Sequence, residues 1–155
     1  MDKKTIKAYW DKFLENKSPR EDYPIGDITI FGGDPQTLAE LVDKNVKTAT
    51  SSAYDLYSDT DYMPTTGDYN IILDADEQPV CITKTLVTEV IPFNLVSAEH
   101  AYHEGEGDRS LKYWREVHED FFTKEYAEAG KKFTEDIPCL CEVFVKVYDE
   151  INGDI

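Results

Sequence analysis

Four runs rich in β-branched and aromatic residues constrain the fold of this chain more than any other feature. They cover residues 69–73, 80–85, 86–91 and 139–148, and the last run is especially rich in valine. The first two are separated by residues 74–78, a polar Asp-Ala-Asp-Glu-Gln segment that favours a turn. Because successive strands joined by short turns pair as antiparallel neighbours, we expect the first three runs to form an antiparallel meander and the fourth to be a closing strand.

Periodicity and capping residues predict two helices in the first third of the chain. Residues 3–16 repeat apolar side chains at helical spacing, which indicates an amphipathic helix docked on the core. A short apolar strand is expected over residues 28–31. After it, Asp34 followed by Pro35 is a typical helix start, and Asn45 can adopt the left-handed conformation that ends a helix.

Two more helices are predicted in the second half. Ser97 can cap a short helix that breaks at Gly105, and Asp108 can cap a longer helix that Gly130 ends. The longer helix is expected to turn four apolar side chains toward the core: Leu111, Trp114, Val117 and Phe121.

A chain of 155 residues with 41% hydrophobic content has material for one packed core. We therefore expect a single α+β domain over residues 1–150 and a loose tail over residues 151–155. No segment approaches the roughly 18 apolar residues of a membrane span, and the first residues do not resemble a signal peptide. The three cysteines lack metal-finger spacing and suit a reducing compartment, so we expect free buried thiols and a cytoplasmic location.

The charge is strongly acidic, with 32 acidic and 16 basic residues and a formal net charge of −16. Most of this surface would repel a phosphate backbone, so long DNA is a poor candidate partner. Residues 1–20 nevertheless hold six basic and three acidic side chains. We interpret this excess as the solvated face of the first helix, and a phosphate-contacting patch is the less favoured alternative.

Residues 45–50, Asn-Val-Lys-Thr-Ala-Thr, resemble the Gly-x-Lys-x-x-Thr signature of ASCH domains, a family named for activating signal cointegrator homology. More telling are Glu-Gly-Glu-Gly-Asp at residues 104–108, then Trp114 and a His-x-x-Phe-Phe pattern at residues 118–122. The resemblance extends from residue 6 to about residue 148. It implies a PUA-like fold, a small closed or nearly closed β-barrel with helices at its ends, related to domains that bind RNA.

Similar members of the family include RNA-binding modules, a ribonuclease, and small amidohydrolases that remove acetyl from the exocyclic amine of acetylcytidine. The amidohydrolases use a Lys, Thr and Glu constellation. Lys47 and Thr50 match the motif directly, and Glu104 ends a segment that resembles the one bearing the family's glutamate. Asn45 replaces the usual glycine, and the acidic surface and longer chain also distinguish this protein from the small amidohydrolases.

The chemistry of such a trio can also be argued from the side chains. A threonine hydroxyl becomes a good nucleophile only when a base within hydrogen-bond reach accepts its proton. Lys47 would be that base if burial kept it neutral, Thr50 the nucleophile, and Glu104 the acid that protonates the leaving amine. In the structural alternative, Lys47 and Glu104 form an ion pair that closes the barrel mouth, and Thr50 is an ordinary strand residue.

Three further candidates for ligand binding follow from residue type and position. Tyr54 and Tyr57, together with Tyr62, could stack on an unpaired base or could be ordinary core or surface tyrosines. Arg109 follows the acidic turn, where it could contact a phosphate or, as the favoured alternative, neutralise a neighbouring glutamate.

We predict no metal and no other cofactor. Five side chains include plausible metal ligands: His100, His103, Glu104, Glu106 and Asp108. A solvated turn with a helix cap explains the same residues. Trp114 and His118, four residues apart on a helix, are interpreted as a core anchor and a satisfied histidine.

The leading hypothesis is a binding domain for a small nucleoside or short RNA, with a cleft sized for one base at which Lys47, Thr50 and Glu104 converge. Its strongest form adds hydrolysis of an amide on an acylated nucleoside. The alternatives are a ribonuclease that cleaves single-stranded RNA with a divalent metal, and a non-enzymatic RNA-binding regulatory module. No membrane partner is expected, and the sequence does not indicate an oligomeric state.

Overall fold

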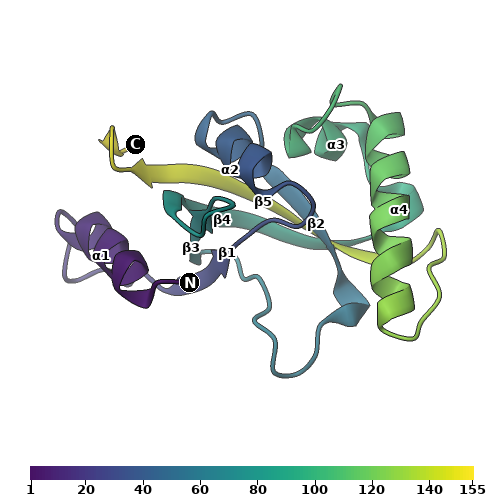
Figure 1. Ribbon diagram of the computed structural model, residues 1–155, viewed down its shortest axis with the longest axis horizontal. Coiled ribbons are helices and arrows are strands. Elements are labelled where there is room, and N and C mark those ends of the chain that lie inside the picture. Colours follow the sequence, from purple (N-terminus) through teal and green to yellow (C-terminus); the bar gives the residue numbers. More distant parts are fainter.

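The computed structural model describes residues 1–155 and shows one curled, mixed β-sheet with helices packed around it (Figure 1). The strands are β1 (Ile25–Thr29), β2 (Ala49–Ala53), β3 (Tyr69–Leu73), β4 (Pro79–Pro92), β5 (Pro138–Asp149) and β6 (Gly153–Asp154). The α-helices are α1 (Lys3–Leu14), α2 (Pro35–Asp43), α3 (Ala98–Glu104) and α4 (Leu111–Glu128), and the 3-10 helices are η1 (Tyr54–Leu56) and η2 (Phe93–Leu95). No helix has both the length and the apolar character that crossing a bilayer requires.

The sheet has the strand order β1-β3-β4-β5-β2, with β6 paired to β5. The pairs β3–β4, β4–β5 and β5–β2 are antiparallel, whereas β1 runs parallel to β3. The sheet forms a half-barrel, with β1 and β2 at its two edges. The expected α+β class is confirmed. The antiparallel pairing expected of the first two runs is confirmed by β3 and β4, but the third run does not form a separate strand, so the expected three-stranded meander is wrong.

Strand β4 differs from the sequence prediction, because it is continuous where two strands were expected over residues 80–91. Its pairing register with β5 shifts after Ile82 and again after Thr85. Such bulges bend a strand without interrupting it. Residues 80–91 contain no glycine or proline that would favour a turn, so the chain bends at the bulges and the sheet curls.

Two helices cover opposite faces of the sheet, and β3 shows the alternation clearly. Ile71 and Leu73 pack in one cluster with Phe13 of α1, whereas Ile72 packs in another with Val42 of α2. This is the period of two expected of a strand that is buried on both faces. Each fully buried apolar side chain contributes about 1.5–3 kcal/mol to the stability of the fold, so both helices are firmly docked on the sheet.

The capping signals in the first third are confirmed. The Asp34 carboxylate accepts a hydrogen bond from Thr37 N at 3.1 Å, and Pro35 begins α2. Asn45 has a φ of 59°, in the left-handed region. The chain therefore leaves α2 in a tight turn that leads directly to Lys47.

The second half requires two corrections. Ser110, two residues later than predicted, caps α4 through the Tyr113 amide, and Asp108 instead accepts a hydrogen bond from Ser110 N. Val117 and Phe121, expected in the core, are 37% and 39% exposed. The buried side of α4 follows a spacing of four residues from Trp114 through positions 118, 122 and 126, which turns Val117 and Phe121 toward the concave side of the sheet.

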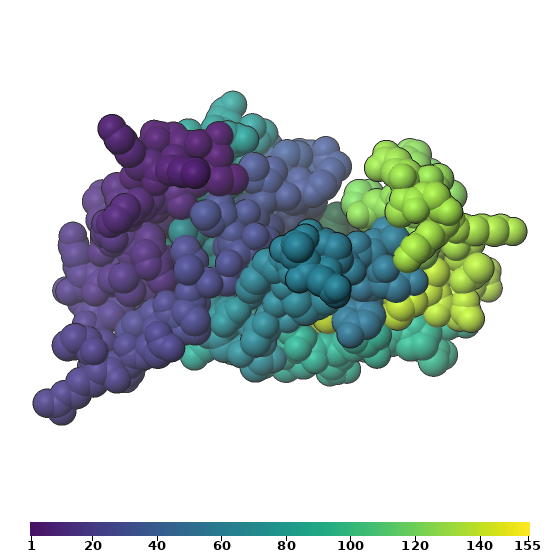
Figure 2. Space-filling model, turned by 90° about the horizontal axis from the view of Figure 1, so that it is seen from below, coloured from purple at the N-terminus to yellow at the C-terminus, as the bar shows by residue number.

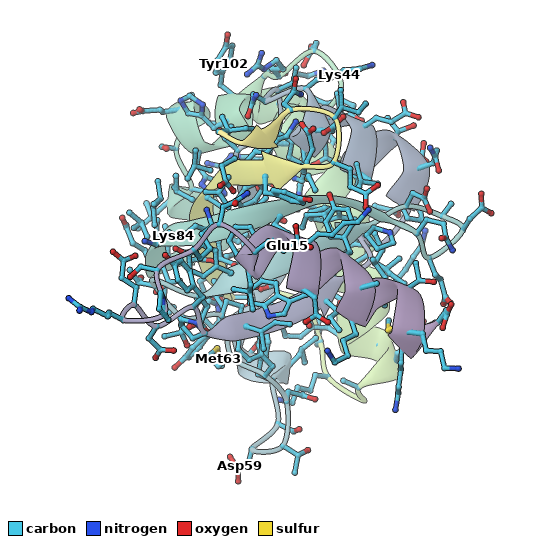
Figure 3. The ribbon with its side chains drawn as sticks, turned by 90° about the vertical axis from the view of Figure 1, so that its left-hand side faces the viewer. Glu15, Lys44, Asp59, Met63, Lys84 and Tyr102 are labelled. Carbon is cyan, nitrogen blue, oxygen red and sulfur yellow. The ribbon has the colours of Figure 1, made fainter.

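The ends of the chain are tied to the sheet. Strand β6 pairs with β5, where the sequence predicts a loose tail, and Lys17 after α1 forms an ion pair with Asp154 at 2.9 Å. The segment between η1 and β3 projects instead, with Asp59 at its tip (Figure 3). The three cysteines are free and buried, as expected.

Gly105 allows the end of α3 to approach the loop before β2 very closely. Its φ is +76°, and an added Cβ would lie 2.6 Å from the carbonyl oxygen of Val46. Next to this contact, Thr48 N donates a hydrogen bond to His103 O at 2.7 Å. These contacts fix the segment that carries Lys47 against the helix that carries Glu104.

We predict that Gly105→Ala destabilises the protein by about 2 kcal/mol more than Gly130→Ala. Both glycines have a positive φ, but a Cβ at Gly130 would meet nothing within 4 Å. The cost of a left-handed alanine is therefore common to both variants, and the difference in their free energies of unfolding measures the contact with Val46. Urea unfolding of the two variants measures it, and equal losses would contradict the close approach.

Candidate functional site

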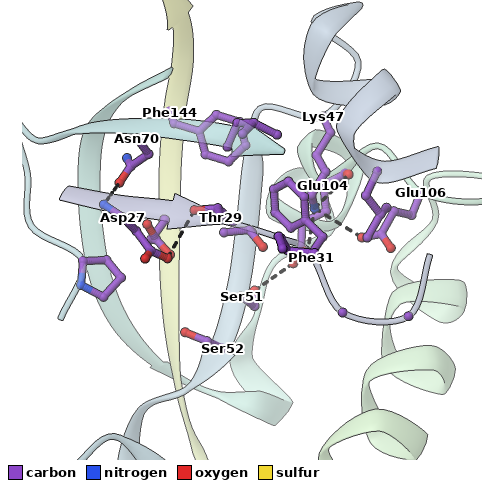
Figure 4. A pocket seen from close by; sticks show the side chains of 18 of the residues that line it. Asp27, Thr29, Phe31, Lys47, Ser51, Ser52, Asn70, Glu104, Glu106 and Phe144 are labelled. Atoms are coloured by element: carbon purple, nitrogen blue, oxygen red, sulfur yellow. Dashed lines mark hydrogen bonds and ion pairs between the residues drawn. The ribbon is translucent and has the colours of Figure 1, made fainter. Parts of the chain in front are cut away.

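A hollow of about 580 Å³ lies on the concave side of the half-barrel. Figure 2 shows a recess between α4 and the rest of the molecule on this face. Figure 4 shows Lys47, Glu104 and Glu106 at one end of the hollow and Asp27 and Asn70 at the other. The aromatic lining consists of Phe31, Tyr57, Tyr62, Phe121 and Phe144. Thr50 also lines the hollow, so the three expected site residues border one cavity.

Lys47 is 2% exposed and is surrounded by hydrogen-bond acceptors. Its Nζ donates to Ala49 O at 2.9 Å, to Glu104 O at 3.4 Å and to the Glu106 carboxylate at 3.3 Å. The nearest oxygen of the Glu104 carboxylate is 3.6 Å away. An ammonium group has three N–H donors, and each has an acceptor here. In this arrangement Lys47 is a hydrogen-bond donor and has no free lone pair for the expected role of base.

Glu104 is 1% exposed, and donors converge on its carboxylate. Oε2 accepts hydrogen bonds from Ser51 Oγ at 2.7 Å and from the indole N–H of Trp114, and it lies 3.0 Å from His100 Nε2. Oε1 lies 3.5 Å from His118 Nε2. A carboxylate this deeply buried is stable only with such compensation.

The charges and hydrogen bonds around Glu104 argue against its expected role as a general acid. Burial by itself would raise the pKa of Glu104, but Lys47 and the two histidines hold that pKa well below its ordinary range. Burial would likewise lower the pKa of His100, whereas hydrogen bonds to Cys141 and Glu104 raise it to about 9. Glu104 is therefore an ionised anchor, and it lacks the proton that a general acid must donate.

A second carboxylate faces the hollow from β5. Glu142 lies directly opposite Thr50 in the antiparallel pair of β2 and β5, and both line the cavity. Burial and the nearby charge of Asp27 raise the pKa of Glu142 to about 7, against the opposing effect of Lys47. Unlike Glu104, Glu142 changes its protonation near neutral pH.

The predicted ligand-binding residues are placed differently from one another. Tyr57 lines the hollow, and its hydroxyl is 2.9 Å from Ser52 Oγ. Tyr54 is 41% exposed and lies outside the lining. Arg109 also lies outside it: its guanidinium donates to Tyr102 O at 2.9 Å and to Val46 O at 3.4 Å. Arg109 therefore joins α3 to the loop before β2, and forms no ion pair with Glu104 or Glu106.

Three potential metal ligands lie together at one end of the hollow. Donor atoms of Glu104, Glu106 and His118 are within 4.8 Å of one another. The Lys47 ammonium lies beside both carboxylates, at 3.6 and 3.3 Å, and supplies positive charge where a cation would bind. A divalent ion at this position would have to overcome repulsion from Lys47.

Sequence reasoning missed several contributors to the site. Trp114 and His118 were assigned to structure alone, yet both contact the Glu104 carboxylate, and their rings stack at 4.3 Å. Their spacing from Glu104 gave no sign of this, because the contact depends on how α3 and α4 cross. Ser51 follows Thr50 directly on β2, and the motif does not indicate that its hydroxyl bonds Glu104. Glu142 could have been found only from the pairing register of β2 and β5.

The curled mixed sheet with helices at its ends and a polar hollow defines a PUA-like domain. The ASCH domain family matches residues 27–148, and the chain belongs to this family. The crystal structure of an ASCH domain from Lactobacillus crispatus superposes with a TM-score of 0.89 at 30% identity, covering 94% of this chain and 96% of that chain. A protein from Enterococcus faecalis gives a TM-score of 0.79 at 34% identity, covering 93% of each chain. No curated protein matches significantly.

We predict that Glu104→Gln destabilises the protein by about 3 kcal/mol or more, because it removes the fully buried carboxylate beside Lys47 and leaves only the partly exposed Glu106 to balance the ammonium charge. Lys47→Met should have a similar cost. The double variant should lose less than the sum of the two, since the interaction between the two charges is lost only once. Urea unfolding of the four proteins tests this, with Glu106→Gln, whose side chain is 22% exposed, as the milder control. Additive losses would contradict the coupling.

The raised pKa of Glu142 predicts how stability depends on pH. The folded state binds this proton more tightly than the unfolded state, whose ordinary value is 4.5. Stability should therefore be lost as pH rises from about 4.5 through 7. Glu142→Gln should remove this loss, so that above pH 8 the variant is more stable than the wild type by up to about 3 kcal/mol. Unfolding at pH 5 and pH 8 measures it, with exposed Glu89→Gln as control.

Proposed function

We propose that this domain binds a single nucleobase of a nucleoside and removes an acyl group from the exocyclic amine of that base. The main support for this proposal is the hollow. Its volume of about 580 Å³ lies within the range of small-molecule sites, and aromatic rings line it from several elements. Aromatic side chains stack readily on unpaired bases, and the polar groups at the two ends of the hollow can bind the edge of a base.

Charge favours a nucleoside over a nucleic acid chain. Six carboxylates line the hollow, with Lys47 as its one lysine and no arginine: Asp27, Asp34, Glu104, Glu106, Glu125 and Glu142. Such a lining repels phosphate, and its acceptors suit a neutral ligand that offers N–H groups. The net charge of −16 adds to the repulsion of RNA.

The chemistry of the proposal is amide hydrolysis with Thr50 as nucleophile, which extends the resemblance to the acetylcytidine amidohydrolases. The Lys47 charge, fixed by Glu104, would stabilise the negative charge that develops on the carbonyl oxygen. Glu104 would act by holding Lys47 and not by proton transfer. The Ser51 hydroxyl donates its hydrogen bond to the Glu104 carboxylate. Thr50 is therefore the hydroxyl of the motif that would face the ligand.

A metal-dependent ribonuclease is the second candidate, and the donor group of Glu104, Glu106 and His118 favours it. The two candidates differ in their metal requirement. Amide hydrolysis by Thr50 needs no divalent ion and should continue in a chelator. Shortening of single-stranded RNA that requires a divalent ion would instead support the ribonuclease.

We predict that the purified protein converts acetylcytidine to cytidine and acetate in the presence of a chelator. Thr50→Ala should lower the rate by about 100-fold or more, because the nucleophile is lost. Thr48→Ala is the matched control, since it removes a hydroxyl from the same motif outside the hollow. Chromatography of the nucleosides measures both. Equal activity of the two variants would contradict the nucleophile, and no turnover by the wild type would contradict the substrate.

Binding of the nucleoside should depend little on salt between about 50 and 500 mM, because no phosphate contacts are broken. The variant with both Lys3→Ala and Lys7→Ala should bind as the wild type does, since Lys7 is exposed and paired with Asp11. Calorimetric titration at several salt concentrations measures this. A steep fall in affinity with salt, together with weaker binding by the variant, would support an RNA-binding module.

A further inference from the structure

Glu142 and Thr50 form a cross-strand pair inside the hollow. They are direct partners in the register of β2 and β5, and both line the cavity. No ion pair or side-chain hydrogen bond from the rest of the protein engages either side chain. Directly opposed residues have Cβ atoms about 4.5–5.5 Å apart, so a glutamate carboxylate can reach the hydroxyl of its partner by a change of rotamer.

We propose that Glu142 is the general base that accepts the hydroxyl proton of Thr50. The inference rests on the proposed function, and it names the group that makes Thr50 a nucleophile. The other two candidates for the base, Lys47 and Glu104, already have hydrogen-bond partners within the protein. Lys47 donates its N–H groups to three acceptors, and the Glu104 carboxylate accepts from Ser51 and Trp114. Glu142 is the neighbouring carboxylate whose lone pairs remain directed to the cavity.

The proposed reaction balances with the ligand and water alone. Thr50 transfers its hydroxyl proton to Glu142 while its Oγ1 attacks the acyl carbon. The C–N bond then breaks, and the leaving nitrogen takes the proton from Glu142, which gives the free amine and an acyl ester of Thr50. Water next transfers a proton to Glu142 and attacks the ester. The bond from the acyl carbon to Oγ1 breaks, Thr50 regains a proton, and the carboxylic acid leaves.

The charges around Glu142 suit this role. Five titratable side chains influence or face it: Asp27 on β1, Lys47 before β2, Tyr57 and Tyr62 in the segment before β3, and Glu104 on α3. Their combined effect with burial raises the pKa of Glu142 to about 7, which is favourable for a base that works near neutral pH. Reactivity should therefore rise with pH, with a midpoint near 7, and Asp27→Asn should move that midpoint to lower pH.

The test measures acylation of Thr50 directly, without the nucleoside. The full chain is treated with p-nitrophenyl acetate between pH 5 and 9, and mass spectrometry of peptides locates and times the acetylation. We expect wild-type Thr50 to be acetylated with the stated pH midpoint. Glu142→Gln should slow it about 100-fold and abolish that pH dependence. Glu89→Gln, which removes an exposed carboxylate from the neighbouring strand, should leave both unchanged.

The outcomes separate the two proposals. Equal rates and pH profiles in the wild type and Glu142→Gln would overturn the base role, and so would a wild type in which Thr50 is not acetylated and no p-nitrophenolate is released. Acetylation of Thr50 that depends on Glu142, in a protein that does not act on acetylcytidine, would support Glu142 as base and overturn the proposed substrate. Glu142→Gln preserves side-chain volume and removes a partly buried charge, so misfolding should not obscure the comparison; circular dichroism checks it.

Discussion

The buried pair of Lys47 and Glu104 is the interaction on which the functional end of this molecule depends. Neither charge would be stable alone in such a dry environment, and each is held by groups from different parts of the chain. Lys47 comes from the turn after α2, Glu104 from the end of α3, and Trp114 from the first turns of α4. The pair therefore joins three segments at one end of the hollow, in addition to the hydrophobic clusters that pack them.

Much of the architecture was predictable because its signals are local. The cap at Asp34, the left-handed Asn45 and the break at Gly105 are properties of a few adjacent residues, and each was placed correctly. The failures have a common cause. Where β4 bends, which side of α4 is buried, and whether residues 153–154 pair with β5 are decided by distant partners. A sequence pattern shows the periodicity of a helix or strand, but it does not show which other element packs against each of its faces.

The candidate site shows the same division. The signature identified Lys47 and Thr50, and the segment before Gly105 identified Glu104, yet the roles expected for two of them did not follow. Protonation depends on burial and on charges from other elements, neither of which a motif contains. Glu142 illustrates the converse. Nothing in its sequence context distinguishes it, and the role proposed for it arises only from the register that sets it opposite Thr50.

The two apolar residues of α4 that are not in the core have a thermodynamic consequence. Val117 and Phe121 are partly exposed because they line the hollow, where their side chains face solvent. A planar ligand that enters the hollow would remove this surface from water, along with its own. Association should then carry a negative heat-capacity change, so that the binding enthalpy becomes more favourable as temperature rises. In this sense, apolar surface left unburied by folding is available to drive recognition.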